Sequence, residues 1–223
     1  MVIVVGSRHD RVAGQLVAEW PGSALCTAED LFQAGWVLRP TRPEKNRWVV
    51  GGRVVPDTDV SGILVRRSSV YPEELVGVDP ADRTYLAAEG TALLIAMLGG
   101  SSARVVNPVT DGGIGSTVWR PERWLQFAGS LGLPVRPLRS ARAHNPVATT
   151  SGTDVVTVLG ARTWGGKDRT AAEDARALLG AAGVVYGRVV LDGDGVVVAV
   201  IPGGDPVGPV RAALRTHLEG PAA

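Results

Sequence analysis

Short apolar runs alternate with amphipathic segments over the first part of the chain. Val2–Val5 is a β-branched run that ends at a glycine, and residues 10–20 follow it with apolar side chains at helical spacing. A strand, a glycine turn and a helix in this order are typical of the first unit of a parallel α/β layer. The alternation continues with a strand at residues 63–65, the longest predicted helix at residues 82–98 and a further strand at residues 104–106.

Two glycine-rich turns predict β-hairpins. Gly51-Gly52 separates residues 48–50 from residues 53–55, and a Gly-Gly pair suits the positive φ angles of a two-residue turn. Near the C-terminus, residues 192–195 separate two apolar runs in the same way. Helices are predicted on either side of this second hairpin, at residues 171–182 and 206–218.

Residues 140–152 show neither helical nor strand periodicity, which predicts a linker. The linker divides the chain into a predicted α/β domain with a mainly parallel sheet, residues 1–147, and a small antiparallel α+β unit, residues 148–223.

Composition narrows the function classes. The 223 residues are 45% hydrophobic and 20% charged, which predicts a packed globular protein, and the formal net charge of +1 does not favour a nucleic-acid partner. Cys26 is the only cysteine, so an intramolecular disulfide and a thiolate-rich metal site are excluded. No apolar run approaches the roughly 20 residues of a membrane span, and no basic segment precedes the first strand. We therefore expect a cytoplasmic protein without a membrane partner.

A series of short motifs runs in a fixed order through the first 140 residues or so. The order resembles the ATP-grasp ligases, specifically the graspetide or microviridin branch that modifies ribosomally made peptides. The motifs are Val65-Arg66-Arg67, Glu89 in the long helix, Asn107-Pro108 after a strand, and residues 120–126 leading to Gly132–Val135. The resemblance implies a pre-ATP-grasp, Rossmann-like layer, followed by a remnant of the C-terminal ATP-grasp lobe.

Four departures from the family pattern bear on catalysis. The resemblance places the family's metal-binding Asp, Glu and Asn at Arg188, Ala199 and Ile201. An arginine repels a cation, and the other two side chains carry no oxygen for Mg²⁺. The chain also has only the predicted linker where the ligases have a central nucleotide lobe with two ATP-binding lysines. The resemblance therefore implies a truncated pseudo-enzyme with neither a metal nor a cofactor.

Arginines and aromatic side chains are the residues best suited to bind peptide carboxylates and apolar groups. We expect a binding set around one crevice between the α/β sheet and the C-terminal unit. The resemblance to truncated ATP-grasp-like proteins of peptide clusters, including the crocagin type, implies a carrier that holds a precursor peptide for partner enzymes. Strand edges left by the truncation favour a homodimer. The predicted set is Arg66, Arg67, Trp119, Arg120, Arg123, Trp124, Arg162, Trp164 and Arg188.

Two alternatives stay open. The chain could be half of a ligase that is active only with a partner chain supplying the nucleotide lobe. It could also be a nucleotide- or small-molecule-binding α/β module that uses the backbone N–H groups of Gly112–Gly115, although this stretch lacks the lysine of a P-loop. The histidines are scattered, so no zinc site or catalytic triad is predicted, and Cys26 is expected to be buried and inert.

Overall fold

The computed structural model describes residues 1–110, 113–115, 119–136 and 153–220. The chain forms two compact units, each described here by itself. The first consists of Met1–Gly115 with Asp205–Ala223, and the second of Ser116–Gly204. Among the described residues, no helix is both long and apolar enough to cross a membrane.

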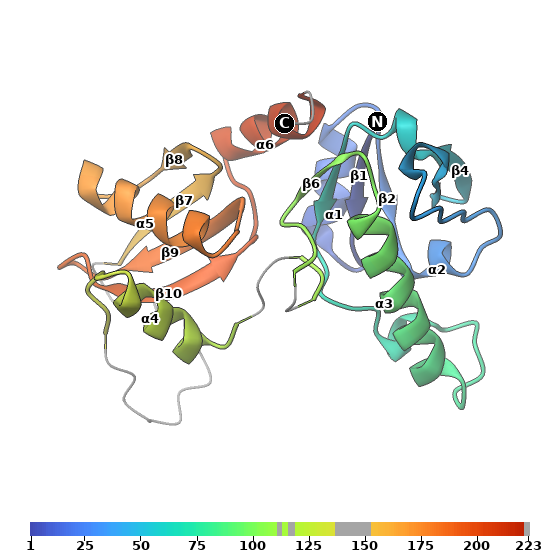
Figure 1. Cartoon of the computed structure of the whole chain (residues 1–223), viewed down its shortest axis with the longest axis horizontal. Coiled ribbons are helices and arrows are strands. Elements are labelled where there is room, and N and C mark those ends of the chain that lie inside the picture. The colour runs from blue at the N-terminus through green and yellow to red at the C-terminus, as the bar shows by residue number, and fades with distance from the viewer. Residues whose placement is uncertain (111–112, 116–118, 137–152, 221–223) are drawn as a thin grey trace. The chain divides into compact units, whose positions relative to one another are not determined.

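The first unit is built on a four-stranded parallel sheet in the order β2-β1-β5-β6 (Figure 1). All four residues of β1 and of β5 are buried, because helices cover both faces of the centre of the sheet. Val4 of β1 pairs with Leu25 on one side and Leu64 on the other. The strands are β1 (Val2–Val5), β2 (Ser23–Cys26), β5 (Gly62–Val65) and β6 (Arg104–Val106).

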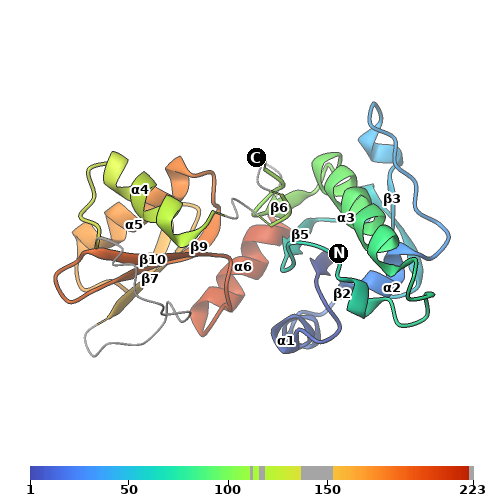
Figure 2. The ribbon, with the colours of Figure 1, turned by 90° about the horizontal axis from the view of Figure 1, so that it is seen from below.

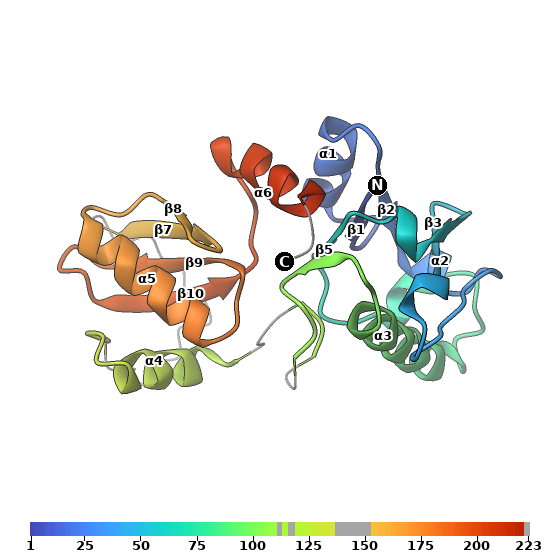
Figure 3. The same cartoon turned by 45° about the horizontal axis from the view of Figure 1, so that its top comes forward.

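Helices lie on both faces of this sheet. Figure 3 shows α1 and α6 on one face and α3 on the other. Asp10 caps α1, since its Oδ1 accepts hydrogen bonds from the backbone N–H groups of Val12 and Ala13 at 3.0 and 3.1 Å. The helices are α1 (Arg11–Glu19), α2 (Ala28–Leu31), α3 (Arg83–Gly99) and α6 (Pro209–Glu219), with 3-10 turns η1 (Pro43–Lys45), η2 (Asp57–Asp59) and η3 (Pro72–Glu74).

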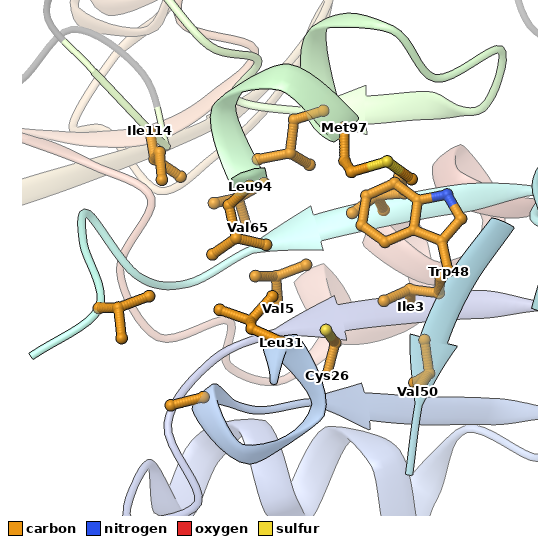
Figure 4. Packing of buried hydrophobic residues seen from close by; sticks show 14 of the residues in the cluster. Ile3, Val5, Cys26, Leu31, Trp48, Val50, Val65, Leu94, Met97 and Ile114 are labelled. Atoms are coloured by element: carbon orange, nitrogen blue, oxygen red, sulfur yellow. The ribbon is translucent and has the colours of Figure 1, made fainter. Parts of the chain in front are cut away.

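The main core of this unit lies on the face of the sheet that α3 covers, where α3 and a β-hairpin pack against the strands. Strands β3 (Arg47–Val50) and β4 (Arg53–Pro56) form that hairpin and bring Trp48 into the core beside Met97 (Figure 4). The indole Nε1 of Trp48 donates to Oδ1 of the buried Asp57 at 2.8 Å. The other Asp57 oxygen accepts from the backbone N–H of Ser102 at 2.8 Å, so this buried carboxylate is hydrogen-bonded through both oxygens.

The second unit is an antiparallel sheet in the order β10-β9-β7-β8 with two helices. Both helices pack on the same face, as Figure 2 shows, and bury Trp124 of α4 and Leu178 of α5 against Val156 and Val189 of the sheet. The elements are α4 (Pro121–Ser130), β7 (Asp154–Leu159), β8 (Arg162–Trp164), α5 (Arg169–Ala181), β9 (Tyr186–Leu191) and β10 (Val197–Pro202).

The predicted hairpins and the long helix are confirmed, but the units divide differently from the predicted domains 1–147 and 148–223. Helix α4 belongs to the second unit, because its apolar face packs on the antiparallel sheet. Helix α6 belongs to the first, where it contacts β5 and β6. The predicted linker at 140–152 lies outside the described residues.

Candidate functional site

A pocket of about 300 Å³ lies at the carboxyl ends of β1 and β5. These neighbouring strands continue in opposite directions across the sheet, β1 to β2 and β5 to β6, so the pocket sits where the strand order reverses. This is the place at which α/β sheets generally bind ligands. The lining residues are Ser7, Asp10, Arg66, Arg67, Ser68, Tyr71 and Glu74.

Arg66 is held by two acids of the first unit. Its Nε and Nη2 donate to the two oxygens of Asp10 at 2.7 and 3.2 Å, and Nη2 also donates to Asp205 Oδ1 at 2.9 Å. Burial alone raises the pKa of Asp10, but hydrogen bonds from Arg66 and from the backbone N–H of Ala13 outweigh it and lower the pKa. The Asp205 side chain is 57% exposed, so it is the most accessible of the three.

Arg67 points into the protein, and its side chain is only 4% exposed. Its Nε donates to Ser69 O at 2.8 Å, its Nη1 donates to Gly6 O at 3.2 Å, and its Nη2 forms an ion pair with Glu74. Burial raises the pKa of Glu74, but the backbone N–H of Tyr71 and the side chains of Ser7 and Arg67 together lower it. Arg67 therefore fastens the loop after β5 to the end of β1.

The lowered pKa of Asp10 predicts acid-dependent stability. A carboxyl group whose pKa is lower in the folded than in the unfolded state stabilises fully above the unfolded value, and the effect is lost as the pH falls through the folded value. We expect the melting temperature of the wild type to fall more steeply from about pH 6 to about pH 3 than that of Asp10→Asn. Asparagine keeps the helix cap, and the exposed Asp194→Asn is the matched control. Equal slopes for wild type and Asp10→Asn would refute the prediction.

An aromatic cluster lies at the start of α4 in the second unit. The Trp119 ring lies 4.7 Å from Trp124 and 5.0 Å from Phe127, and the Arg123 guanidinium lies 4.5 Å from the Trp119 ring centre. Trp124 is buried in the core, whereas Arg123 and Arg120 are exposed. Of the predicted residues in this region, Trp124 is thus a core residue, and Trp119 carries the cation–π contact.

The remaining predicted residues meet on one sheet face. The face of the second unit's sheet opposite α4 and α5, here the helix-free face, is covered by no described helix of that unit. Across its four strands Ile201 pairs with Arg188, Arg188 with Thr157, and Thr157 with Trp164, so these four side chains form one row. Arg162 lies on the same face, with its guanidinium 5.0 Å from the Trp164 ring centre.

Arg188 occupies the middle of this row and is half-buried. Its Nε is inaccessible and has no hydrogen-bond partner among the described residues. The guanidinium lies beside the backbone of Gly204, where a Cβ atom would come within 2.7 Å of Nη2. Gly204 therefore gives the guanidinium the room that it occupies.

The three positions that the resemblance equates with metal ligands are neighbours on the helix-free face. Ile201 lies opposite Arg188, and Ala199 lies opposite Val190, two residues further along β9. These side chains do not fit a Mg²⁺ ion, because a guanidinium repels it and the aliphatic groups offer no oxygen. Within the described residues, no three His, Cys, Asp or Glu side chains cluster as a metal site.

No family model matches the sequence. The chain has the fold of the ATP-grasp ligases that act on ribosomal peptides. Macrocyclase MdnC of Microcystis aeruginosa, solved with its precursor peptide MdnA, aligns with a TM-score of 0.70 at 14% identity over 97% of this chain and 98% of that chain. Macrocyclase MdnB of the same organism gives 0.67 at 15% identity with the same coverage. A RiPP-associated ATP-grasp ligase of Chryseobacterium gregarium, solved with ADP and a leader and core peptide, gives 0.65 at 9% identity over 97% and 96% of the two chains.

One sequence similarity concerns a different class of protein. The polyketide synthase GfsE of Streptomyces halstedii is 34% identical over 116 residues, an alignment that includes 44% of this chain. The chain spans only 3% of that synthase, so the match carries no activity over to it.

The structure distributes the predicted binding residues over two units. Arg66 and Arg67 lie together at the pocket of the first, whereas the other seven belong to the second. Asp10, Tyr71 and Glu74 also line this pocket but were not predicted as site residues. The sequence pattern around Asp10 indicates only that it can cap the following helix. The pairing of acids with Arg66 and Arg67 was not predicted.

The structure describes only part of Gly112–Gly115, the stretch that the alternative hypothesis of nucleotide binding invokes. Gly115 approaches the pocket closely, since a Cβ there would lie 3.2 Å from Arg67 O, and Ile114 is buried in the core. Gly112 lies outside the described residues. Cys26 is buried, as predicted, and burial raises the pKa of its thiol.

Proposed function

We propose that the protein is a non-catalytic peptide-binding protein that holds a ribosomally made precursor peptide for the enzymes that modify it. The observation that carries the proposal is the chemistry of the helix-free face. It presents Arg188, Ala199 and Ile201 side by side, in a fold whose solved examples include complexes with precursor peptides. These three side chains offer no ligand for the Mg²⁺ of ATP-dependent ligation, and the exposed Arg162 and partly exposed Trp164 and Arg188 of this face are available to a peptide.

We further propose that the central nucleotide lobe of the ligases is absent. This proposal depends on spacing along the sequence. Val135 forms an isolated parallel bridge with Val197, and β7 begins at Asp154. Residues 137–153 alone therefore separate the described end of the α4 segment from the antiparallel sheet, and they contain no lysine for the ATP phosphates.

Of the predicted binding residues, those of the helix-free face suit a peptide best. Arg162, Trp164 and Arg188 combine two cations with a rigid aromatic surface, whereas Arg66 and Arg67 are already bonded to acids of their own unit. Trp119, Arg120 and Arg123 extend the proposal to the start of α4. The edge strands β8 and β10 could pair with a second copy, so a homodimer is part of the proposal.

The test is calorimetric titration of the whole chain with Mg-ATP and, separately, with the peptide encoded beside its gene. We expect heat of binding with the peptide and none with Mg-ATP. Binding of Mg-ATP without peptide would overturn the proposal in favour of a nucleotide-binding module. ATP hydrolysis that requires both this chain and a neighbouring gene product would instead identify half of a split ligase.

A further inference from the structure

We infer that Arg188 is an anion subsite that takes one carboxylate of the bound peptide directly, at the centre of the helix-free face. This inference rests on the proposed function and deepens it by naming the chemistry recognised. The ligand is a segment in which a carboxylate is followed or preceded, at a fixed spacing, by an aromatic or other large apolar side chain.

The first reason is the unmet hydrogen-bonding capacity of Arg188. A guanidinium has five N–H donors, and the buried Nε–H of Arg188 has no hydrogen-bond partner among the described residues. The side chain is nevertheless half-buried, with Nε inaccessible. A cation that is partly removed from water without an acceptor is destabilising, so the site gains most from a ligand that supplies an anion.

The second reason is the charge of the surroundings. At the paired strand positions of the helix-free face, only Arg162 and Arg188 are charged. The nearest acids along the strands are engaged elsewhere: Asp192 Oδ2 accepts from Arg136 at 2.6 Å, and Asp154 Oδ2 accepts from the backbone N–H of Lys167 at 2.5 Å. Other residues of this face are the buried Thr157, Leu159, Tyr186 and Val190, the partly exposed Trp164, Ala199 and Ile201, and the exposed Val155.

The third reason is that the backbone leaves room for the guanidinium. Gly204 has a positive φ of 90°, and a side chain there would approach Nη2 and Nε of Arg188 to 2.7 and 2.8 Å. Only glycine at this position therefore leaves the guanidinium where it lies. A guanidinium can bind a carboxylate through two parallel hydrogen bonds.

The row of paired residues sets the spacing of the ligand. Trp164 lies two strands away from Arg188, which corresponds to about 10 Å between their backbones. An extended peptide covers about 3.3 Å per residue and alternates its side chains between two faces, so a carboxylate on Arg188 places the side chain two or four residues away, at about 7 or 13 Å, on the side of Trp164. Arg162, stacked on Trp164, keeps a second cation at that end.

The experiment compares two peptides on four forms of the whole chain. The first peptide is the one encoded beside the gene, and the second carries Asn and Gln for every Asp and Glu with an amidated C-terminus. We expect Arg188→Met to weaken the first peptide about 10- to 100-fold, and Arg188→Lys to weaken it less. Arg176→Met changes an exposed arginine of α5, on the helix-covered face, and should bind like the wild type. Against the second peptide, wild type and Arg188→Met should have equal affinity.

The outcomes separate this inference from the proposed function. If the wild type binds the first peptide and Arg188→Met binds it equally well, Arg188 is not the subsite, although the protein still binds peptide. If the wild type binds neither peptide, the proposed function fails.

The side-chain ¹⁵N spectrum of the protein, with the Arg188 Nε–H signal assigned through Arg188→Lys, then tests the anion chemistry alone. A shift of that signal on adding glutarate supports the subsite, and a shift with inorganic phosphate but not glutarate overturns the carboxylate assignment.

Discussion

Replacing Arg67 with methionine should lower the free energy of unfolding of the first unit by about 3–5 kcal/mol. The cause is the partner that the substitution leaves behind. Glu74 would keep a largely buried carboxylate without its cation, and the carbonyls of Gly6 and Ser69 would each lose a donor. Urea unfolding, followed by hydrogen exchange in peptides from each unit, measures the loss and assigns it to the first unit.

A double-mutant cycle separates the ion pair from the packing of the long side chain. Because Glu74→Gln removes the unpaired charge, the double variant Arg67→Met with Glu74→Gln should be less destabilised than the sum of the two single variants. Arg66→Met is the comparison, since its partner Asp10 lies nearer to solvent and a smaller loss is expected. Additive effects of the two single substitutions would show that Arg67 and Glu74 do not act as a pair.

The same variant bears on the predicted peptide-binding role of Arg67. A residue that only fastens the loop after β5 would change stability while leaving peptide affinity unchanged, provided that the protein is folded at the temperature of the titration. A weakened affinity in the folded variant would favour the prediction made from the sequence. The two measurements together therefore assign Arg67 to structure or to binding.

Local patterns predicted local structure well. The Gly51-Gly52 turn and the turn at residues 192–195 each carry the residues that a hairpin needs, so both hairpins could be predicted without knowing their neighbours. The position of Arg66 and Arg67 was predictable for the same reason, because an apolar strand-like run ending in two arginines places them at the carboxyl end of a strand. Their partners were not, since Asp10 lies 56 residues before Arg66.

Long-range pairing was the part that the sequence could not supply. The predicted boundary at residue 147 treated everything after the linker as one unit, yet α6 packs on β5 and β6 of the first. Nothing within α6 signals which sheet its apolar face will cover. Similarly, Arg188 and Trp164 were both singled out, but their common row depends on the register of β7 with β9, which connects distant segments.

The close contact between Gly62 of β5 and Leu218 of α6 leads to a second prediction with a large effect on stability. Gly62→Ala should destabilise the first unit by about 3 kcal/mol or more. The added Cβ would lie 2.4 Å from the backbone carbonyl oxygen of Leu218 and 2.8 Å from the Leu218 Cβ. A backbone atom cannot rotate away as the end of a side chain can, so either α6 or β5 must move.

Gly14→Ala is the matched control, because it makes the same chemical change in the same unit with the opposite expected sign. Gly14 lies in the interior of α1, and a Cβ there meets no atom within 4 Å. Alanine should therefore stabilise the helix by about 0.5–1 kcal/mol. Chemical denaturation of both variants gives the two signs, and hydrogen exchange in α6 shows where Gly62→Ala acts. If Gly62→Ala left α6 as protected as in the wild type, the helix would not depend on this contact, and its assignment to the first unit would lose its physical basis.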